Sequence, residues 1–353
     1  MGLFGSIFKK EKKHKGYFEL SILKIVRLNE SSVKIEFDIP EHLESKFNFI
    51  AGQFINILVE INGKEERRSY SICSGKGEKL AIGIKSVKGG IVSNWFNEEA
   101  QEGSQLFVTE AQGNFKAPEG AKEIATIAAG SGITPILSIL KSKTSTQNIH
   151  LLYGNRSKKE AMFLNEIDSL EKIKTSLFYS GTQETDTING RIDKDSLTKL
   201  IKEDLKFLQK DAFLICGPEE MILGCIEALE FFGVTKEKII YELFTTPVNL
   251  GVEEDKSDFS GASEVTVTLD DEDFHMTMEN DSGTILDAVE EEGMDAPYSC
   301  RGGVCCSCKA KVTEGSADMK LNYSLSKQEV EEGYILTCQA FPTSSKVKIS
   351  FDE

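Results

Sequence analysis

Ser299-Cys300-Arg301-Gly302-Gly303-Val304-Cys305-Cys306-Ser307-Cys308 is the most informative stretch of this 353-residue chain. Three of its cysteines follow the pattern Cys-x4-Cys-x2-Cys, and a fourth, Cys338, stands far downstream. This is the plant-type spacing for a 2Fe–2S cluster, and soft thiolate ligands suit iron–sulfur chemistry. Gly302 and Gly303 let the backbone approach a cluster and direct N–H groups at sulfur. We therefore expect the cluster to be bound by Cys300, Cys305, Cys308 and Cys338.

Zinc is the alternative metal for these cysteines. Zinc sites usually pair their cysteines in short knuckles, whereas Cys338 has no cysteine near it in the sequence. Cys306 lies inside the loop without changing the ligand spacing, so we interpret it as a small packed side chain. Cys73 and Cys225 have no partner by spacing and are expected in the core.

The composition is that of an ordinary globular protein, with 40% hydrophobic and 28% charged residues. The formal net charge of −16 disfavours a nucleic-acid binder, which normally carries a basic face. Residues 263–353 hold 19 acidic and 7 basic side chains, so most of the excess charge lies in the last quarter of the chain. No apolar run approaches the ~18 residues of a membrane-spanning helix. Without a recognisable signal peptide, clustered cysteines predict a reduced, cytoplasmic setting.

The chain divides into five segments. We expect a flexible basic tail over 1–16, a β-barrel over 17–118, an α/β domain over 119–247, a linker over 248–262 and a β-grasp ferredoxin domain over 263–353. The first six residues fit a myristoylation pattern, but this short pattern is often matched by chance, and membrane contact is not expected.

Two kinds of hydrophobic pattern separate the first two domains. Short alternating segments predict six antiparallel strands and a small closed barrel, with one helix over 91–99. Buried apolar strands alternating with helices then predict a parallel, doubly wound sheet. The expected strands are 18–28, 33–39, 54–61, 68–73, 80–87 and 105–110, then 124–129, 149–153, 176–179, 212–216 and 239–244; the expected helices of the sheet domain are 133–141, 158–171, 194–201 and 219–232.

The barrel carries a motif that suits a flavin. Arg68, Tyr70 and Ser71 supply in order a cation for a pyrophosphate, an aromatic face for the isoalloxazine and a small hydroxyl near the redox nitrogen. An ordinary strand with surface charge is the alternative. A second, weaker contact is expected at the glycine turn that opens a helix, Gly89-Gly90-Ile91-Val92-Ser93, because helix N-termini offer free N–H groups to phosphate.

A nucleotide-binding turn follows the first strand of the α/β domain. Gly130-Ser131-Gly132-Ile133-Thr134-Pro135 joins this strand to a helix, and its glycines permit close approach of a pyrophosphate. It is not a full Gly-x-Gly-x-x-Gly fingerprint. Cys216-Gly217-Pro218 ends a later strand, at the edge where ligands bind in open α/β sheets.

The loop after the next strand bears on the choice of nicotinamide. Arg156 and Ser157 offer a cation and a hydroxyl for a 2′-phosphate, and the loop itself contains no acidic residue for a free 2′-hydroxyl. This favours NADPH over NADH. A solvated loop is the alternative.

Taken together, these motifs resemble the ferredoxin–NADP reductase superfamily with a plant-type ferredoxin fused at the C-terminus. The motifs occur in the family's order, and Tyr241-Glu242-Leu243-Phe244 resembles the end of the family's reductase part. Within it, the reductase components of phenylacetyl-CoA epoxidases share the Arg-Arg-x-Tyr-Ser-Ile-Cys stretch. The resemblance implies FAD, a nicotinamide donor and a 2Fe–2S cluster, with catalytic roles for Ser71, Cys216 and Glu242.

The function implied is an NAD(P)H-dependent reductase that passes electrons through FAD and the cluster to an oxygenase, with the phenylacetyl-CoA epoxidase as the leading acceptor. We expect the acceptor protein to dock at the acidic ferredoxin domain. Another multicomponent oxygenase or a hybrid-cluster protein remains open as the acceptor. A non-catalytic redox sensor is the alternative from a different class.

Overall fold

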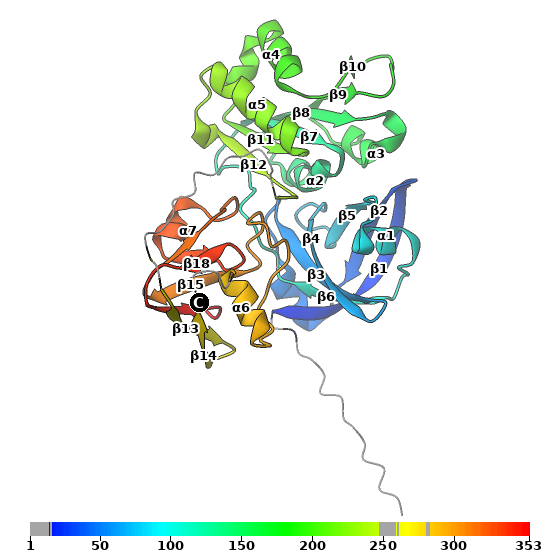
Figure 1. The fold of residues 1–353 in the computed structure, drawn as a ribbon. Coiled ribbons are helices and arrows are strands. Elements are labelled where there is room, and N and C mark those ends of the chain that lie inside the picture. Colours follow the sequence, from blue (N-terminus) through cyan, green and yellow to red (C-terminus); the bar gives the residue numbers. More distant parts are fainter. Residues whose placement is uncertain (1–13, 15, 247–258, 260, 280–282) are drawn as a thin grey trace, which may run out of the picture.

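The computed structural model describes residues 14, 16–246, 259, 261–279 and 283–353. They form three domains: a blue and cyan barrel, a green sheet flanked by helices, and a yellow-to-red domain beside the barrel (Figure 1). Most of the tail expected over 1–16 and of the linker expected over 248–262 lies outside the described residues. His14 is described, and its buried ring packs edge-on against Phe107, with 5.2 Å between ring centroids.

The first domain is a six-stranded antiparallel sheet with the order β4-β3-β6-β1-β2-β5. Alternation along the strands places apolar side chains such as Ile22, Ile35 and Ile57 in a common interior. The edge strands β4 and β5 meet through a bridge between Ile72 and Ile82, which closes the barrel. The predicted six-stranded barrel is confirmed, with β1 (Tyr17–Asn29), β2 (Ser32–Asp38), β3 (Phe54–Ile61), β4 (Lys64–Ser71), β5 (Ala81–Lys85), β6 (Gln105–Thr109) and the helix α1 (Ile91–Glu98).

The second domain is a parallel sheet with the order β10-β9-β8-β7-β11-β12. Helices α2 and α3 cover the face toward the barrel, and α4 and α5 cover the other face (Figure 1). The strand order reverses between the neighbours β7 and β11, so their carboxyl ends form the switch point where such sheets bind ligands. The predicted doubly wound sheet is confirmed, with β7 (Glu123–Ala129), α2 (Ile133–Ser142), β8 (Asn148–Asn155), α3 (Leu164–Asp168), β9 (Ile173–Tyr179), β10 (Ile188–Asn189), α4 (Lys194–Glu203), β11 (Ala212–Cys216), α5 (Glu219–Phe231) and β12 (Ile239–Glu242).

The third domain is a mixed sheet with the order β14-β13-β19-β15-β17, in which β13 and β19 run parallel. Helix α6 packs its apolar side against this sheet, and Thr284 and Asp287 cap its first turn reciprocally. The cysteine loop runs from α6 to β15. The elements are β13 (Ser263–Leu269), β14 (Glu272–Met278), α6 (Ile285–Glu291), β15 (Lys309–Glu314), β16 (Ala317–Met319), α7 (Lys327–Glu331), β17 (Tyr334–Leu336), β18 (Ala340–Pro342) and β19 (Lys346–Ser350).

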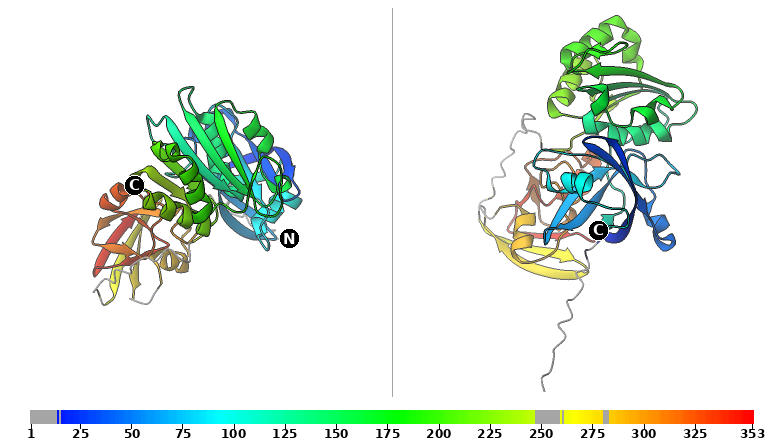
Figure 2. Two further views of the ribbon diagram at one scale, coloured as in Figure 1. Left: turned by 90° about the horizontal axis from the view of Figure 1, so that it is seen from above. Right: turned by 90° about the vertical axis from the view of Figure 1, so that its right-hand side faces the viewer.

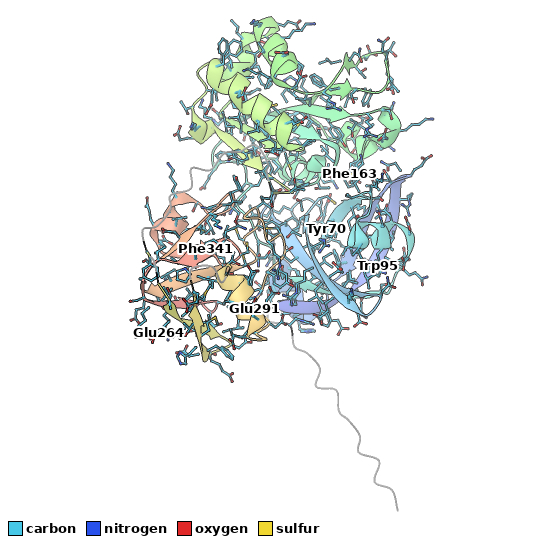
Figure 3. The ribbon with its side chains drawn as sticks, viewed as in Figure 1. Tyr70, Trp95, Phe163, Glu264, Glu291 and Phe341 are labelled. Atoms are coloured by element: carbon cyan, nitrogen blue, oxygen red, sulfur yellow. The ribbon has the colours of Figure 1, made fainter. Side chains whose placement is uncertain are left out.

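The helix predicted over 158–171 is broken. A 3-10 turn covers Lys158–Glu160, and α3 begins only at Leu164, because Phe163 between them has a φ of 61°. The buried hydroxyl of Tyr153 accepts from the Met162 N–H at 3.0 Å and donates to the Met162 carbonyl at 3.2 Å. These bonds tie the segment into the core. Phe163, labelled in Figure 3, lies where the sheet domain meets the barrel.

The ferredoxin domain contacts both other domains. Buried Arg67 of β4 pairs with Asp295 at 2.5 Å and donates to the Ala296 carbonyl at 3.1 Å. On the other side, Val304 of the cysteine loop and Tyr323 pack against the core of the sheet domain. The views in Figure 2 show the third domain beside the barrel. The cysteine loop therefore lies where all three domains meet.

None of the helices that the structure describes combines the length and apolar character needed to cross a membrane.

Candidate functional site

A cavity of about 440 Å³ lies where the three domains meet. The barrel contributes Arg68, Tyr70 and Ser71, the sheet domain contributes Glu242, and the ferredoxin domain contributes Cys300 and Cys305. These residues are separated by up to 237 positions in the chain, yet they line one space. Further predicted residues in its wall are Gly90, Ile91, Val92, Ser93, Ser131 and Thr134.

The barrel wall offers a mixed surface to this cavity. Tyr70, labelled in Figure 3, is largely buried, and its ring meets Phe96 edge-on at 5.9 Å. Burial raises the pKa of its phenol well above the usual range. The half-exposed guanidinium of Arg68 pairs with Glu66 at 3.0 Å. An anionic group entering the cavity would therefore compete with Glu66 for this cation.

The turn before α1 requires glycine at both Gly89 and Gly90. Gly89 has a φ of 75°, and a Cβ at Gly90 would lie 2.5 Å from the Ser93 hydroxyl. That hydroxyl accepts from the Val87 N–H at 3.2 Å. Ser93 thus fixes the turn, while its own proton stays available for a group in the cavity.

A partly buried carboxyl, Glu242, faces the barrel from the end of β12. Ser71 Oγ donates to Glu242 Oε2 at 3.4 Å. Burial raises the pKa of Glu242 to about 8, and the Ser71 hydrogen bond opposes this only in part. Cys216 pairs with Glu242 across β11 and β12, and burial raises the pKa of its thiol far above the usual value. Both groups therefore keep their protons near neutral pH.

The turn after β7 packs closely against the end of β11. A Cβ on Gly132 would overlap the Cys216 carbonyl, and one on Gly217 would lie 2.6 Å from the Met221 methyl. By contrast, Gly130 has a φ of 55° with open space around it. Gly132 and Gly217 are thus needed for close packing of the two strand ends, whereas a Cβ on Gly130 would meet no atom. Of the residues predicted for this turn, Gly130, Gly132, Ile133 and Pro135 do not line the cavity, nor do Cys216, Gly217 and Pro218.

Arg156 and Ser157 lie apart from the cavity, in the loop after β8. Arg156 is exposed, and its carbonyl accepts from the Gly181 N–H at 2.8 Å, which holds the next loop alongside. That neighbouring loop brings in Glu184, whose Oε1 lies 3.4 Å from the Lys158 N–H and 3.2 Å from the Thr182 hydroxyl. An acidic group therefore does lie beside the Arg156 loop, because Glu184 arrives from a segment distant in sequence.

The four predicted cluster ligands form two pairs. Cys300 Sγ and Cys305 Sγ lie 3.0 Å apart, and Cys308 is hydrogen-bonded to Cys338. The bond from Cys300, followed by one from Ser307, lowers the pKa of Cys305 to about 6. The bond from Cys308 likewise lowers the pKa of Cys338. The same two hydrogen bonds raise the pKa of the other thiol in each pair, Cys300 and Cys308.

This pairing fits two iron atoms better than one zinc ion. Among the described residues, no three His, Cys, Asp or Glu side chains gather as a single-ion site. In a 2Fe–2S cluster each iron takes two protein thiolates, which matches the two pairs. The Gly302 N–H also points at Cys300 Sγ, at 3.3 Å. The two thiol pairs and this N–H group therefore suit a cluster with two iron atoms.

The sequence reading missed several residues of the cavity wall. Gly83 could have been predicted, because a glycine inside a strand often marks a place where a ligand or another part of the chain approaches the backbone closely. A Cβ there would lie 2.7 Å from the Phe163 ring and 2.8 Å from the Thr134 methyl. Leu243 and Phe244 belong to the stretch that resembles the family's reductase end, although no binding role was predicted for them. The remaining residues of the wall, which carry no local signal, are Phe54, Ser69, Lys85, Val87, Thr245 and Val304.

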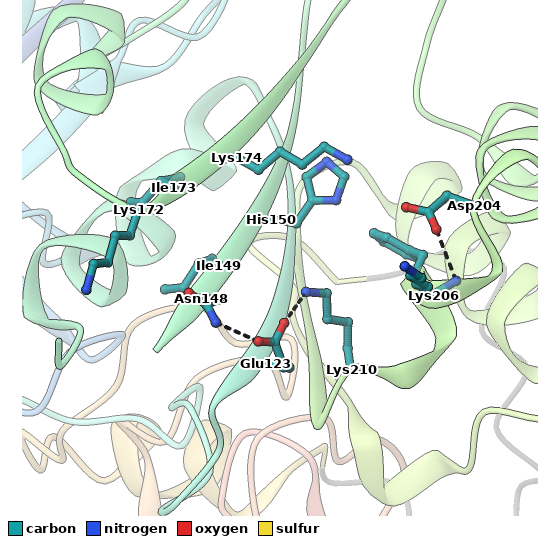
Figure 4. A pocket seen from close by; sticks show the side chains of 11 residues that line it. Glu123, Asn148, Ile149, His150, Lys172, Ile173, Lys174, Asp204, Lys206 and Lys210 are labelled. Atoms are coloured by element: carbon teal, nitrogen blue, oxygen red, sulfur yellow. Dashed lines mark hydrogen bonds and ion pairs between the residues drawn. The ribbon is translucent and has the colours of Figure 1, made fainter. Parts of the chain in front are cut away.

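A second cavity, of about 490 Å³, lies at the opposite edge of the parallel sheet (Figure 4). Its wall includes His150 and four lysines, and Lys210 pairs with Glu123 at 2.7 Å. Burial, with Lys174 and Lys210 nearby, lowers the pKa of His150 to about 4. None of the predicted site residues lines this cavity, so we do not place the chemistry there.

Three family models cover most of the chain. Residues 11–117 match the oxidoreductase FAD-binding domain, residues 126–226 the oxidoreductase NAD-binding domain, and residues 267–343 the 2Fe-2S iron-sulfur cluster binding domain. The cofactors of the chain are therefore FAD, NAD(P)H and a 2Fe–2S cluster, in the order that the motifs predict.

Relatives and solved structures share this organisation over nearly their whole length. The chain is 35% identical to one component of the 1,2-phenylacetyl-CoA epoxidase of Escherichia coli (strain K12), over 95% of this chain and 98% of that protein. It is 29% identical to the ferredoxin reductase component of 3-ketosteroid-9-alpha-monooxygenase of Mycolicibacterium smegmatis, over 95% and 97%. The solved structure of phthalate dioxygenase reductase has the same fold, with a TM-score of 0.60 and 21% identity over 95% of this chain and 98% of that one.

The domain order, the cavity shared by three domains and the similarity to whole reductase components agree. The chain belongs to the family of NAD(P)H-dependent oxygenase reductase components that combine FAD-binding, NAD-binding and 2Fe–2S ferredoxin domains for electron transfer.

Proposed function

We propose that this reductase transfers electrons within the cavity between the three domains and delivers them to a phenylacetyl-CoA oxygenase. One observation carries the first part: the wall that holds Ser71 and Glu242 also holds Cys300 and Cys305. A group bound in this cavity would therefore contact both Glu242 of the NAD-binding domain and the cysteine loop of the ferredoxin domain.

The residues present fit FAD. Arg68 would bind its pyrophosphate together with the turn Gly89-Gly90-Ile91-Val92-Ser93, and Tyr70 would pack against the ring system. When bound, FAD supplies the conversion between the two-electron chemistry of a nicotinamide and the one-electron chemistry of the cluster. Cys300, Cys305, Cys308 and Cys338 would hold the cluster. Glu242, whose side chain is partly buried, forms part of the cavity wall on the side of the sheet domain.

Ser71, Glu242 and Cys216 are the proposed catalytic residues. With a pKa of about 8, Glu242 holds a proton at neutral pH, and Ser71 is oriented by donating to it. Cys216 stays a neutral thiol behind this pair. Ser71 and Glu242 thus present an uncharged, proton-bearing surface to the cavity, where the reacting groups must not be repelled by a fixed negative charge.

We propose NADPH as the preferred donor, with the nucleotide held by the turn from Gly130 to Pro135 and by Cys216-Gly217-Pro218. Arg156 and Ser157 would contact its 2′-phosphate. Glu184 works against this preference, because its carboxylate lies on the neighbouring loop. Arg156→Ala should raise the Michaelis constant for NADPH at least tenfold more than that for NADH, and Glu184→Gln should shift the preference further toward NADPH. Equal effects of Arg156→Ala on both nucleotides would contradict this role.

The acceptor is proposed from the relative that shares 35% identity over almost the full length. The ferredoxin domain, with 19 acidic and 7 basic residues over 263–353, offers a negative surface for a basic patch on the acceptor. Reduced cysteine ligands suit a cytoplasmic location.

A reconstituted mixture tests this proposal. The purified holoprotein is combined with a phenylacetyl-CoA oxygenase and NADPH, and consumption of phenylacetyl-CoA is followed. We expect turnover that depends on this chain, and much slower turnover when a ketosteroid oxygenase and its substrate replace them. Dye reduction without any phenylacetyl-CoA turnover would contradict the proposed acceptor.

A further inference from the structure

Asn56 of the barrel lies beside the cysteine loop of the ferredoxin domain. It is on β3, is 1% exposed, and takes no part in the chemistry described above. Its amide oxygen accepts from two hydroxyls: Ser69 Oγ at 2.7 Å from the neighbouring strand, and Ser307 Oγ at 3.0 Å from the ferredoxin domain. Its Nδ2 faces the Gln112 amide oxygen at 3.4 Å. The Asn56 amide is therefore a buried group that is hydrogen-bonded to two domains at once.

Ser307 connects the Asn56 amide to the proposed cluster ligand Cys305. Its hydroxyl lies 3.2 Å from Cys305 Sγ as well as 3.0 Å from Asn56 Oδ1. A serine hydroxyl carries a single proton, so it donates to only one of these acceptors at a time. The barrel amide and the ligand sulfur therefore compete for the same proton.

Other contacts between the barrel and the ferredoxin domain keep the Asn56 amide next to the cysteine loop. The buried guanidinium of Arg67 pairs with Asp295 and donates to the Ala296 carbonyl, a few residues before the cysteine loop. Ser69 also lies 2.9 Å from Ser299 Oγ, next to the ligand Cys300. These contacts keep the loop against β3 and β4, so the competition for the Ser307 proton persists while the domains are docked.

Hydrogen bonds to the sulfurs are among the factors that set the reduction potential of an iron–sulfur cluster. A donor to a thiolate sulfur stabilises the reduced cluster, which carries one more negative charge, and so raises the potential. We infer that Asn56 is a positioning residue that lowers the potential of the cluster from another domain, by drawing the Ser307 proton away from Cys305. This inference rests on the proposed function, since it requires the cluster at these four cysteines.

A redox titration of the holoprotein tests the inference. The cluster potential is measured by electron paramagnetic resonance in the wild type, Asn56→Leu, Ser307→Ala and the double variant. We expect Asn56→Leu to move the potential in the positive direction and Ser307→Ala to move it in the negative direction. The expected change in the electron-transfer equilibrium is up to about tenfold, or about 59 mV for a one-electron couple. The double variant should match Ser307→Ala, because Asn56 acts through that hydroxyl.

Two further variants make the result decisive. Ser324→Ala removes a hydroxyl that donates to the Cys305 carbonyl at 3.0 Å and not to its sulfur, so the potential should stay at the wild-type value. Asn56→Ala removes the amide with a smaller side chain and should shift the potential in the same direction as Asn56→Leu.

The outcomes separate this inference from the proposed function. A potential that is unchanged or more negative in the Asn56 variants would overturn the inference, as would an equal shift with and without Ser307. Loss of the cluster in both Asn56 variants would also overturn it, because Asn56 would then serve assembly. Absence of a cluster in the wild type would instead remove the proposed function, and the inference with it.

Discussion

Glu242 illustrates what a single residue contributes to this site. The sequence resemblance indicates its position, but its unusual proton affinity arises only when β12 brings it under the barrel beside Ser71. Desolvation disfavours the charged carboxylate, and one long hydrogen bond at 3.4 Å compensates little. The residue is thus a proton-bearing group because of the domain contact, not because of its neighbours in sequence.

Substitution of Glu242 should change how stability depends on pH. The pKa of Glu242 is about 8 in the folded protein, and that of a glutamate in an unfolded chain is about 4.3. Between these values the unfolded chain has released the proton and the folded chain keeps it, so the stability of the wild type falls as pH rises through this window. The decrease in the free energy of unfolding is complete above about pH 8 and amounts to roughly 3–5 kcal/mol.

Glu242→Gln removes this titration. Its melting temperature should therefore exceed that of the wild type by a margin that grows from about pH 5 to pH 8 and then stays constant. Glu171→Gln, which alters an exposed carboxyl of the same domain, is the control and should follow the wild type. A Glu242→Gln profile parallel to the wild type would show that the carboxyl does not retain its proton in this range.

At the scale of elements, hydrophobic patterns predict the long strands and helices well. The strands β3 and β11 have the predicted bounds, because their apolar residues face a core on a regular period. The break at Phe163 was not predictable, since it depends on the Tyr153 hydroxyl binding Met162. The strands β10, β16 and β18 are too short to show a period, so only pairing with a neighbour defines them.

The cysteine loop is an element whose shape depends on another domain. A Cβ on Gly302 would overlap the hydroxyl of Thr246, at the end of the sheet domain. Gly302→Ala should therefore displace the loop at a cost of roughly 1–3 kcal/mol and reduce the amount of bound cluster. Reduction of the flavin by NAD(P)H should continue at the wild-type rate. Iron and acid-labile sulfide content measure the first effect, and stopped-flow absorbance measures the second.

Removal of the obstacle tests this explanation. Thr246→Gly in the Gly302→Ala background should restore the cluster content, since the overlapping side chain is gone. If cluster content stayed low in this double variant, the overlap with Thr246 would not be the cause.

At the scale of the whole molecule, three domains create a site that none of them contains alone. The four cysteines and the Arg68–Ser71 segment could each be proposed as binding residues from local spacing, because short motifs of this kind indicate their chemistry. The cavity could not, because contacts such as those of Arg67 with Asp295 and of Asn56 with Ser307 join residues more than 220 positions apart. Likewise, Glu184 meets the Arg156 loop only through the packing of adjacent loops.

The charge distribution of the whole molecule leads to a salt-dependence prediction. An acidic ferredoxin domain that docks on a basic acceptor should be steered by long-range attraction. The second-order rate of acceptor reduction should fall about tenfold as ionic strength rises from roughly 0.01 M to 0.15 M. Electron transfer from flavin to cluster within the chain is the internal control and should not change. An acceptor rate that is independent of salt would contradict docking through the acidic domain.

The central claim is that one chain carries electrons from NAD(P)H through its flavin to its own cluster. An anaerobic single-turnover experiment with NADPH, combining stopped-flow absorbance with freeze-quenched electron paramagnetic resonance, tests it most directly. We predict that loss of the oxidised flavin band is followed by the signal of a reduced 2Fe–2S cluster, at a first-order rate that does not change with protein concentration. A flavin that is reduced while the cluster stays oxidised, or a cluster signal whose rate rises with protein concentration, would contradict the account.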